Sequence, residues 1–220
     1  MPSVSQIPTR TLAFVAAAFV LGYPCFVIAA NVVQRDHYDA ASQAMSDLAL
    51  GRDGWLMTLA FISLGVGNLL MAPLVRRLAP RAIVGPGLLA ASACTTLLSA
   101  VFQTDADGAP STLHGAIHIA LGLGSFVLVI AAMTACAVAY LRSSSHRALG
   151  LASAVWAGLQ LGAIVLTFVL PSSLFGVGQR TILAVAISWL LTTCAIAIRS
   201  ASDGSRRSLR AAVPSARSAL

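Results

Sequence analysis

Long apolar runs separated by short polar segments dominate the chain. Six runs stand out, at residues 11–33, 55–75, 83–102, 113–141, 148–170 and 181–198. A helix needs about 20 consecutive apolar residues to cross the hydrocarbon core of a bilayer. The runs are continuous rather than alternating, which favours helices over strands. The pattern therefore predicts an all-α, polytopic membrane protein built as a bundle of six transmembrane helices.

The polar segments between the runs contain typical helix breakers, among them Pro80, Gly108, Pro110 and Pro171. The longest connection covers residues 34–54. We therefore expect one transmembrane domain over residues 11–199, preceded by a short segment at residues 1–10. Residues 200–220 are rich in Ser, Ala and Arg and have no apolar period, so we expect a disordered, basic tail.

Composition agrees with membrane insertion. Hydrophobic residues make up 58% of the chain and charged residues 10%, whereas charged residues are about a quarter of a soluble domain. The four cysteines all lie inside apolar runs, where they act as small hydrophobic side chains rather than as a disulfide framework. All fourteen basic residues are arginines.

The arginines predict the orientation of the bundle. Positively charged loops stay on the cytoplasmic side of a membrane. If both termini are cytoplasmic, eleven of the fourteen arginines are inside and only Arg35, Arg52 and Arg180 are outside. The arginines form no single patch beside a soluble domain, so we expect no nucleic-acid partner.

This topology places most of the aspartate and histidine side chains on the outer face. Six of the seven aspartates fall there, and so do three of the four histidines. His114 and His118 are spaced four residues apart, which puts both imidazoles on one face of a helix. With Asp105 they could bind a metal such as zinc. A structural network of interfacial histidines and loop aspartates explains the same residues.

The outer loop, residues 34–54, has its own pattern. Ala41, Ala44, Met45 and Leu48 lie at helical spacing, so we expect a short amphipathic helix over residues 40–50, with Ser42 as a possible cap. Ser46 and Asp47 would face the mouth of the bundle if this helix packs over the ends of the spans. A solvated lid without chemistry is the alternative.

Gly158 and Gly162 form a small-xxx-small pair in the fifth run. Such pairs let helices approach closely, either within one bundle or between two copies. The chain is therefore a possible homo-oligomer or a partner of another membrane protein.

Several short motifs occur in a distinctive order. Met45-Ser46-Asp47-Leu48-Ala49 ends the outer loop, Thr112 to His118 begins the fourth run, and Gly176-Val177-Gly178-Gln179-Arg180 precedes the sixth. This set resembles the bacterial membrane-protein family catalogued as domain of unknown function 998, which is similar to the eukaryotic Frag1/DRAM/Sfk1 proteins. The resemblance implies a six-helix bundle in the bacterial inner membrane and a link to lipid. It marks the following motif positions: Ser46, Asp47, Asp105, His114, His118 and Arg180.

Three functions are compatible with these features. The first is binding or organising membrane lipid, with Arg180 engaging a headgroup above a polar Asp/His network. The second is a metal-dependent hydrolase of a lipid ester or amide, with His114, His118 and Asp105 as ligands and Ser46 or Asp47 near the attacking water. The third is an accessory subunit of a membrane complex.

Overall fold

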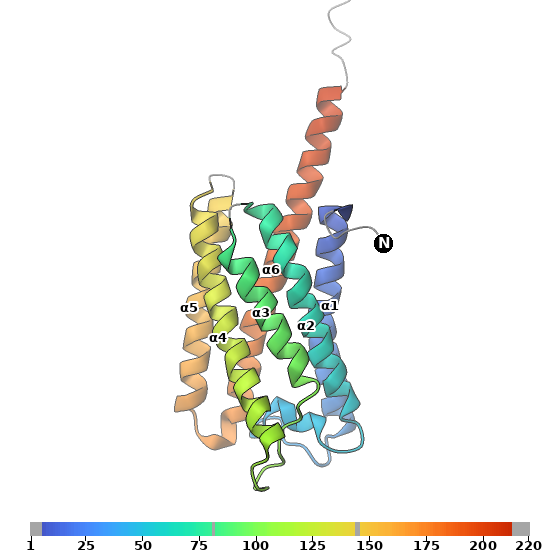
Figure 1. Ribbon diagram of the computed structural model, residues 1–220, viewed down its shortest axis with the longest axis vertical. Coiled ribbons are helices and arrows are strands. Elements are labelled where there is room, and N and C mark those ends of the chain that lie inside the picture. The colour runs from blue at the N-terminus through green and yellow to red at the C-terminus, as the bar shows by residue number, and fades with distance from the viewer. Residues whose placement is uncertain (1–5, 81, 144–145, 213–220) are drawn as a thin grey trace, which may run out of the picture.

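The computed structural model describes residues 6–80, 82–143 and 146–212 and shows a bundle of long helices (Figure 1). The described residues form six α-helices: α1 (Thr9–Val33), α2 (Trp55–Leu78), α3 (Val84–Ser99), α4 (Leu113–Leu141), α5 (Arg147–Val169) and α6 (Phe175–Ala212). These positions agree with the six apolar runs, and the prediction for residues 113–141 has the bounds of α4. The all-α prediction is confirmed.

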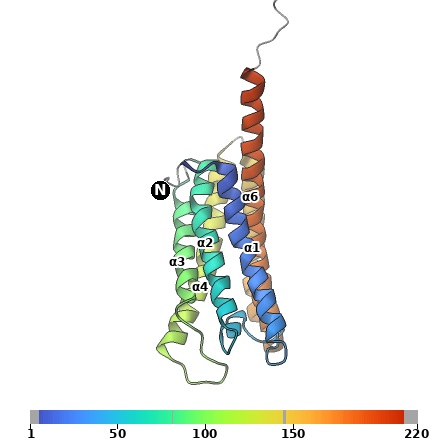
Figure 2. The same ribbon diagram turned by 90° about the vertical axis from the view of Figure 1, so that its right-hand side faces the viewer.

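The helices form a ring. Each helix packs against the next one in the sequence, and α6 returns to pack against α1. Residues 34–54, 100–112 and 170–174 connect helices at one end of the bundle, which we call the outer end after the predicted orientation (Figures 1 and 2). The start of α1 and the end of α6 lie at the opposite, inner end.

Five helices are long and apolar enough to cross a membrane, and α3 is a shorter apolar helix of 16 residues. The third run was predicted to continue to Phe102, but α3 ends at Ser99 because residues 100–102 form a tighter turn. The short α3 packs between α2 and α4 and runs antiparallel to both (Figure 1). The chain is thus a polytopic helical membrane bundle.

The prediction for the tail differs from the structure. Residues 200–212 continue α6 rather than forming irregular chain, and the helix extends beyond the other five (Figure 2). Ala and Arg have high helix propensity, and the chain has no proline until Pro214, which would break a helix. The end of the predicted tail, residues 213–220, and the predicted inner arginine Arg81 lie outside the described residues.

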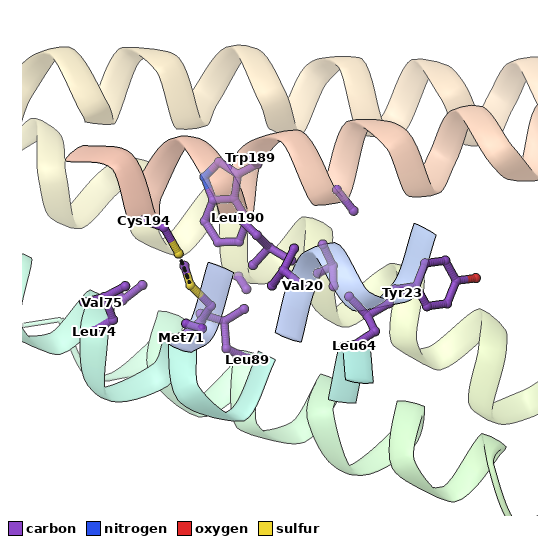
Figure 3. Close-up of a cluster of buried hydrophobic side chains, with 14 of the residues drawn as sticks. Val20, Tyr23, Leu64, Met71, Leu74, Val75, Leu89, Trp189, Leu190 and Cys194 are labelled. Carbon is purple, nitrogen blue, oxygen red and sulfur yellow. Dashed lines mark hydrogen bonds between the residues drawn. The ribbon is translucent and has the colours of Figure 1, made fainter. Parts of the chain in front are cut away.

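The core lies mainly among α1, α2 and α6. Figure 3 shows large buried side chains from these helices packed together, including Val20 of α1, Met71 of α2 and Trp189 of α6. The Trp189 indole N–H donates to Ser153 Oγ of α5 at 3.1 Å, which satisfies the one polar atom of this buried ring. Close packing and internal hydrogen bonds hold helices together where lipid removes the hydrophobic driving force.

The ring is not equally tight all round. At the inner end, Gly150 of α5 lies so close to α4 that an added Cβ would be 2.7 Å from the backbone nitrogen of Leu141. Nearer the outer end, Gly122 of α4 has no atom within 4 Å of such a Cβ. Helices α4 and α5 therefore converge at the inner end and separate toward the outer end, as Figure 1 also shows.

Candidate functional site

The outer loop folds over the ends of the helices. Its central part is a short 3₁₀ helix, Met45–Ala49, with Met45, Leu48 and Ala49 buried against α1, α2 and α6. The helix is shorter than the predicted one at residues 40–50, and Ser42 donates to Asp39 rather than capping it. The segment packs over the outer ends of the spans, which was the condition for Ser46 and Asp47 to face the mouth of the bundle. We call residues 38–49 the lid.

The first turns of α6 attach the lid. An added Cβ on Gly176 would lie 2.5 Å from the carbonyl oxygens of Ala40 and Gln43, so only glycine allows this contact. The Val177 N–H donates to Ala41 O at 3.1 Å, and the Met45 N–H donates to Gln179 Oε1 at 2.5 Å. The motif before the sixth span is therefore a docking surface for the lid.

Arg180 completes this attachment. Its guanidinium donates to Tyr38 Oη at 2.7 Å, to Asn31 Oδ1 at 3.3 Å and to Gly176 O at 3.0 Å, and it also lies over the Tyr38 ring. Within the part of the chain that is described, Arg180 pairs with neither Asp47 nor Asp105. Its hydrogen bonds join α1, the lid and α6.

Asp47 lies half-buried in the lid. Its carboxylate accepts from the Ala44 N–H at 3.1 Å, which closes the start of the 3₁₀ helix. Burial raises the pKa of Asp47 above its usual range, and this effect exceeds the opposing effect of the Ala44 hydrogen bond. The negative charge of Asp107 raises the pKa further, whereas His118 lowers it. Asp47 and His118 therefore interact electrostatically across the mouth of the bundle.

Asp105 has a local structural role. Its two carboxylate oxygens accept from the Thr112 N–H at 2.8 Å and the Thr112 hydroxyl at 2.7 Å, and Thr112 in turn caps α4 by accepting from the Gly115 N–H. The two Thr112 hydrogen bonds lower the pKa of Asp105. Gly115 leaves the space that this carboxylate occupies. This arrangement fixes the start of α4.

The two motif histidines occupy different environments. His114 is exposed and its ring lies against Phe102, with 5.3 Å between centroids. His118 is only 7% exposed, its Nδ1 lies 2.7 Å from Phe102 O, and its ring meets Phe61 edge-on. No group of three His, Cys, Asp or Glu side chains able to hold a metal occurs among the described residues, so the predicted zinc site is not found there. Asp105 is bonded to Thr112, and His118 Nδ1 to Phe102 O.

A cavity of about 640 Å³ opens beneath the lid. Its wall is apolar and comes from all six helices and the lid. Its polar lining near the outer end includes Ser46, Thr104, His118 and Gln179. Along α4 the lining runs from His118 to Val127, about 14 Å at 1.5 Å per residue. The cavity therefore extends well into the depth of the bilayer.

The cavity also reaches the side of the bundle. Four apolar residues of its lining are more than half exposed, namely Ile119, Leu123 and Val127 of α4 and Phe168 of α5. These side chains stand where α4 and α5 separate. The cavity therefore opens sideways, toward the hydrocarbon of a surrounding membrane.

The structure brings some predicted residues together and separates others. Ser46 and His118 line one cavity, and Asp47 lies near enough to His118 to interact with it. Arg180 holds the lid from another side, while Asp105 and His114 belong to the cap of α4. Sequence reasoning missed Tyr38 as the partner of Arg180, although an aromatic with a hydroxyl in a loop of charged residues was a usable signal.

Six apolar helices in a ring, closed at one end by a docked lid, define a multi-pass integral membrane protein. The chain belongs to the family described as protein of unknown function (DUF998), whose model matches residues 13–196. This range includes α2 to α5, most of α1, the first part of α6 and every motif residue named above. No curated protein and no solved structure matches the chain.

Proposed function

We propose that this protein binds membrane lipid, with a hydrocarbon chain in the cavity between α4, α5 and α6 and the polar end of the lipid beneath the lid. The observation that carries the proposal is the apolar cavity of about 640 Å³, a size typical of small-molecule sites. A water-filled cavity of this composition would be costly, because apolar walls bind water poorly. Hydrocarbon from the bilayer fits its lining.

The sideways opening gives lipid a route of entry. A lipid can reach the cavity between α4 and α5 without leaving the bilayer, because the exposed residues along this route are apolar. The polar residues Ser46, Thr104 and Gln179 then meet the end of the lipid near the membrane surface. We place this site in the outer leaflet of the bacterial cytoplasmic membrane, following the distribution of arginines.

In this proposal Arg180 holds the lid, whereas the sequence suggested that it binds a lipid headgroup. Its donors reach Tyr38, Asn31 and Gly176, so it supports the binding site by holding the lid. Contact of Arg180 with a lipid headgroup stays a prediction. It would require the guanidinium to exchange one of these partners for a phosphate oxygen.

A cavity-filling substitution tests the proposal. Gly122 lines the cavity and has open space around its Cβ direction, so Gly122→Leu fills the cavity without a backbone clash. Gly124→Leu is the matched control, because Gly124 has the same open space but does not line the cavity. Native mass spectrometry of both variants would measure the lipid that remains bound.

We expect Gly122→Leu to lose most of the lipid that wild type retains after purification, and Gly124→Leu to keep it. Unchanged melting temperatures would show that both variants are folded. If Gly122→Leu retains as much lipid as the control, lipid does not occupy this cavity and the proposal is wrong.

A further inference from the structure

The orientation of His118 limits what the cavity can bind. The Phe102 carbonyl oxygen, 2.7 Å from His118 Nδ1, can only accept a hydrogen bond, so Nδ1 carries the hydrogen. In the neutral imidazole the lone pair is then on Nε2. Because the ring also packs edge-on against Phe61, it cannot rotate freely to exchange the two nitrogens.

Nε2 has no hydrogen-bond partner within the described part of the chain, although the side chain is only 7% exposed and lines the cavity. Nε2 is not among the fully buried atoms that lack a partner, so it faces the space of the cavity, where a polar atom without a partner costs free energy. Such atoms in native proteins are usually satisfied by water or by a ligand. The acceptor at Nε2 is thus available to a donor inside the cavity.

The charges around the cavity disfavour lipids with an anionic phosphate group at this position. The cavity lining includes no arginine and no aspartate among the residues described, and the donors of Arg180 are directed to Tyr38, Asn31 and Gly176. The half-buried carboxyl of Asp47 lies near the mouth and would repel a phosphate when ionised. A buried phosphodiester without a cationic partner is costly.

We propose that the cavity takes an uncharged lipid with a free hydroxyl group, and that His118 Nε2 accepts the hydrogen bond from that hydroxyl. The inference rests on the proposed lipid binding and names its ligand class. Ser46 lines the same cavity from the lid and adds a hydroxyl group to its polar lining. A diacylglycerol is one lipid with this chemistry.

The test uses three probes with the same acyl chains: 1,2-dioleoylglycerol, its 3-O-methyl ether and dioleoylphosphatidylglycerol. The ether carries a methyl group in place of the one donor hydrogen, and His118→Asn controls for the added methyl group. We expect the wild-type protein in nanodiscs to bind the alcohol about tenfold more tightly than the ether, the value of one hydrogen bond to a buried acceptor. Equal binding of alcohol and ether would overturn the inference.

His118→Asn assigns the preference to Nε2. The asparagine amide nitrogen takes the place of Nδ1 and can still donate to Phe102 O, while the Nε2 acceptor is lost. We expect alcohol binding to fall about tenfold with ether binding unchanged. A preference that survives in a folded His118→Asn variant contradicts the role of His118.

The remaining outcomes separate this inference from the proposed function. If phosphatidylglycerol binds most tightly and depends on His118, the ligand is anionic and the inference fails while lipid binding stands. If Gly122→Leu leaves the binding of all three probes unchanged, the cavity is not the lipid site and both proposals fail.

Discussion

Glycines have opposite effects on the tight side of the bundle, formed by α1, α2 and α6, and on its open side, between α4 and α5. In α2, an added Cβ on Gly67 would lie 2.8 Å from Val20 Cγ2 and 3.1 Å from the Val20 nitrogen, so this glycine allows α1 and α2 to touch. In α4, Gly122 lines the cavity and has no atom within 4 Å of an added Cβ. Small residues therefore mark helix contact on one side and leave space on the other.

The difference has a physical cause. Lipid tails are as apolar as the side chains that they replace, so helices in a membrane associate through close packing rather than through the hydrophobic effect. Helices α1, α2 and α6 achieve that packing around Met71 and Trp189 (Figure 3). Helices α4 and α5 pack closely at the inner end, near Gly150, and separate toward the outer end (Figure 1). The remaining space is the cavity.

The largest effect is expected on the tight side. Gly67→Ala places a methyl group against the backbone of Val20, which cannot move away as a flexible side chain can. Overpacking of this kind costs about 1–3 kcal/mol. A clear fall in melting temperature in detergent is the expected result, and a wild-type value would show that α1 and α2 are not in close contact.

The lid is expected to be the next most sensitive region. Arg180→Ala removes the hydrogen bonds to Tyr38, Asn31 and Gly176, so the lid loses its attachment to this arginine while the packing of the helices is retained. We expect faster hydrogen exchange over residues 38–49, measured by mass spectrometry. Arg35→Ala is the control, because its ion pair with Asp36 is almost fully exposed.

The same Arg180→Ala variant separates two roles of this arginine. Loss of lid protection with an unchanged lipid profile supports the role in lid attachment. Selective loss of anionic phospholipid with normal lid protection would instead support contact with a headgroup.

A smaller effect is expected at Asp47, and it depends on pH. Because the pKa of Asp47 is raised in the folded protein, its ionised form disfavours folding at neutral pH. This cost disappears as the pH falls through the raised pKa. Asp47→Asn should therefore be at least as stable as wild type at pH 7, and its advantage should shrink in acid.

The comparison between wild type and Asp47→Asn isolates this group. The pKa values of Asp39 and Asp105 are lowered in the folded state, so both aspartates add stability above their ordinary pKa that is lost in acid. Asp39 and Asp105 make the same contribution to stability in wild type and in Asp47→Asn. A constant difference in melting temperature between pH 7 and pH 4 would contradict the assignment.

The smallest effect is expected on the open side. Gly158→Ala meets no atom, so stability should stay within about 1 kcal/mol of wild type. The within-bundle packing expected for Gly158 and Gly162 is thus not found. A change in oligomeric state on size-exclusion chromatography would show that a second copy packs there, which the sequence also allowed.

The helices could be predicted well from the sequence because an apolar run of about 20 residues that crosses a membrane must satisfy its backbone hydrogen bonds internally, as a helix does. The sequence placed α4 at its observed bounds. It also indicated Ser46, Asp47 and His118 as residues near one another. These predictions depend on composition and on connectivity, both of which can be read along the chain.

The roles of the motif residues could not be predicted in the same way. His114 and His118 share the spacing of a metal pair, but Phe102 O binds one ring and the Phe102 side chain packs on the other. The partners of Arg180, Asn31 and Tyr38, lie about 150 residues away in the sequence. Only the closed ring of helices brings them together.

We propose that hydrocarbon enters the cavity between α4 and α5. The most direct test is photolabelling with a lipid that carries a diazirine in its acyl chain, followed by peptide mapping. Ile182 lines the cavity but is only 3% exposed, so lipid around the bundle cannot reach it. We predict adducts on Ile182 that disappear in Gly122→Leu. Adducts confined to outward-facing residues such as Val165 would show that hydrocarbon stays outside the cavity.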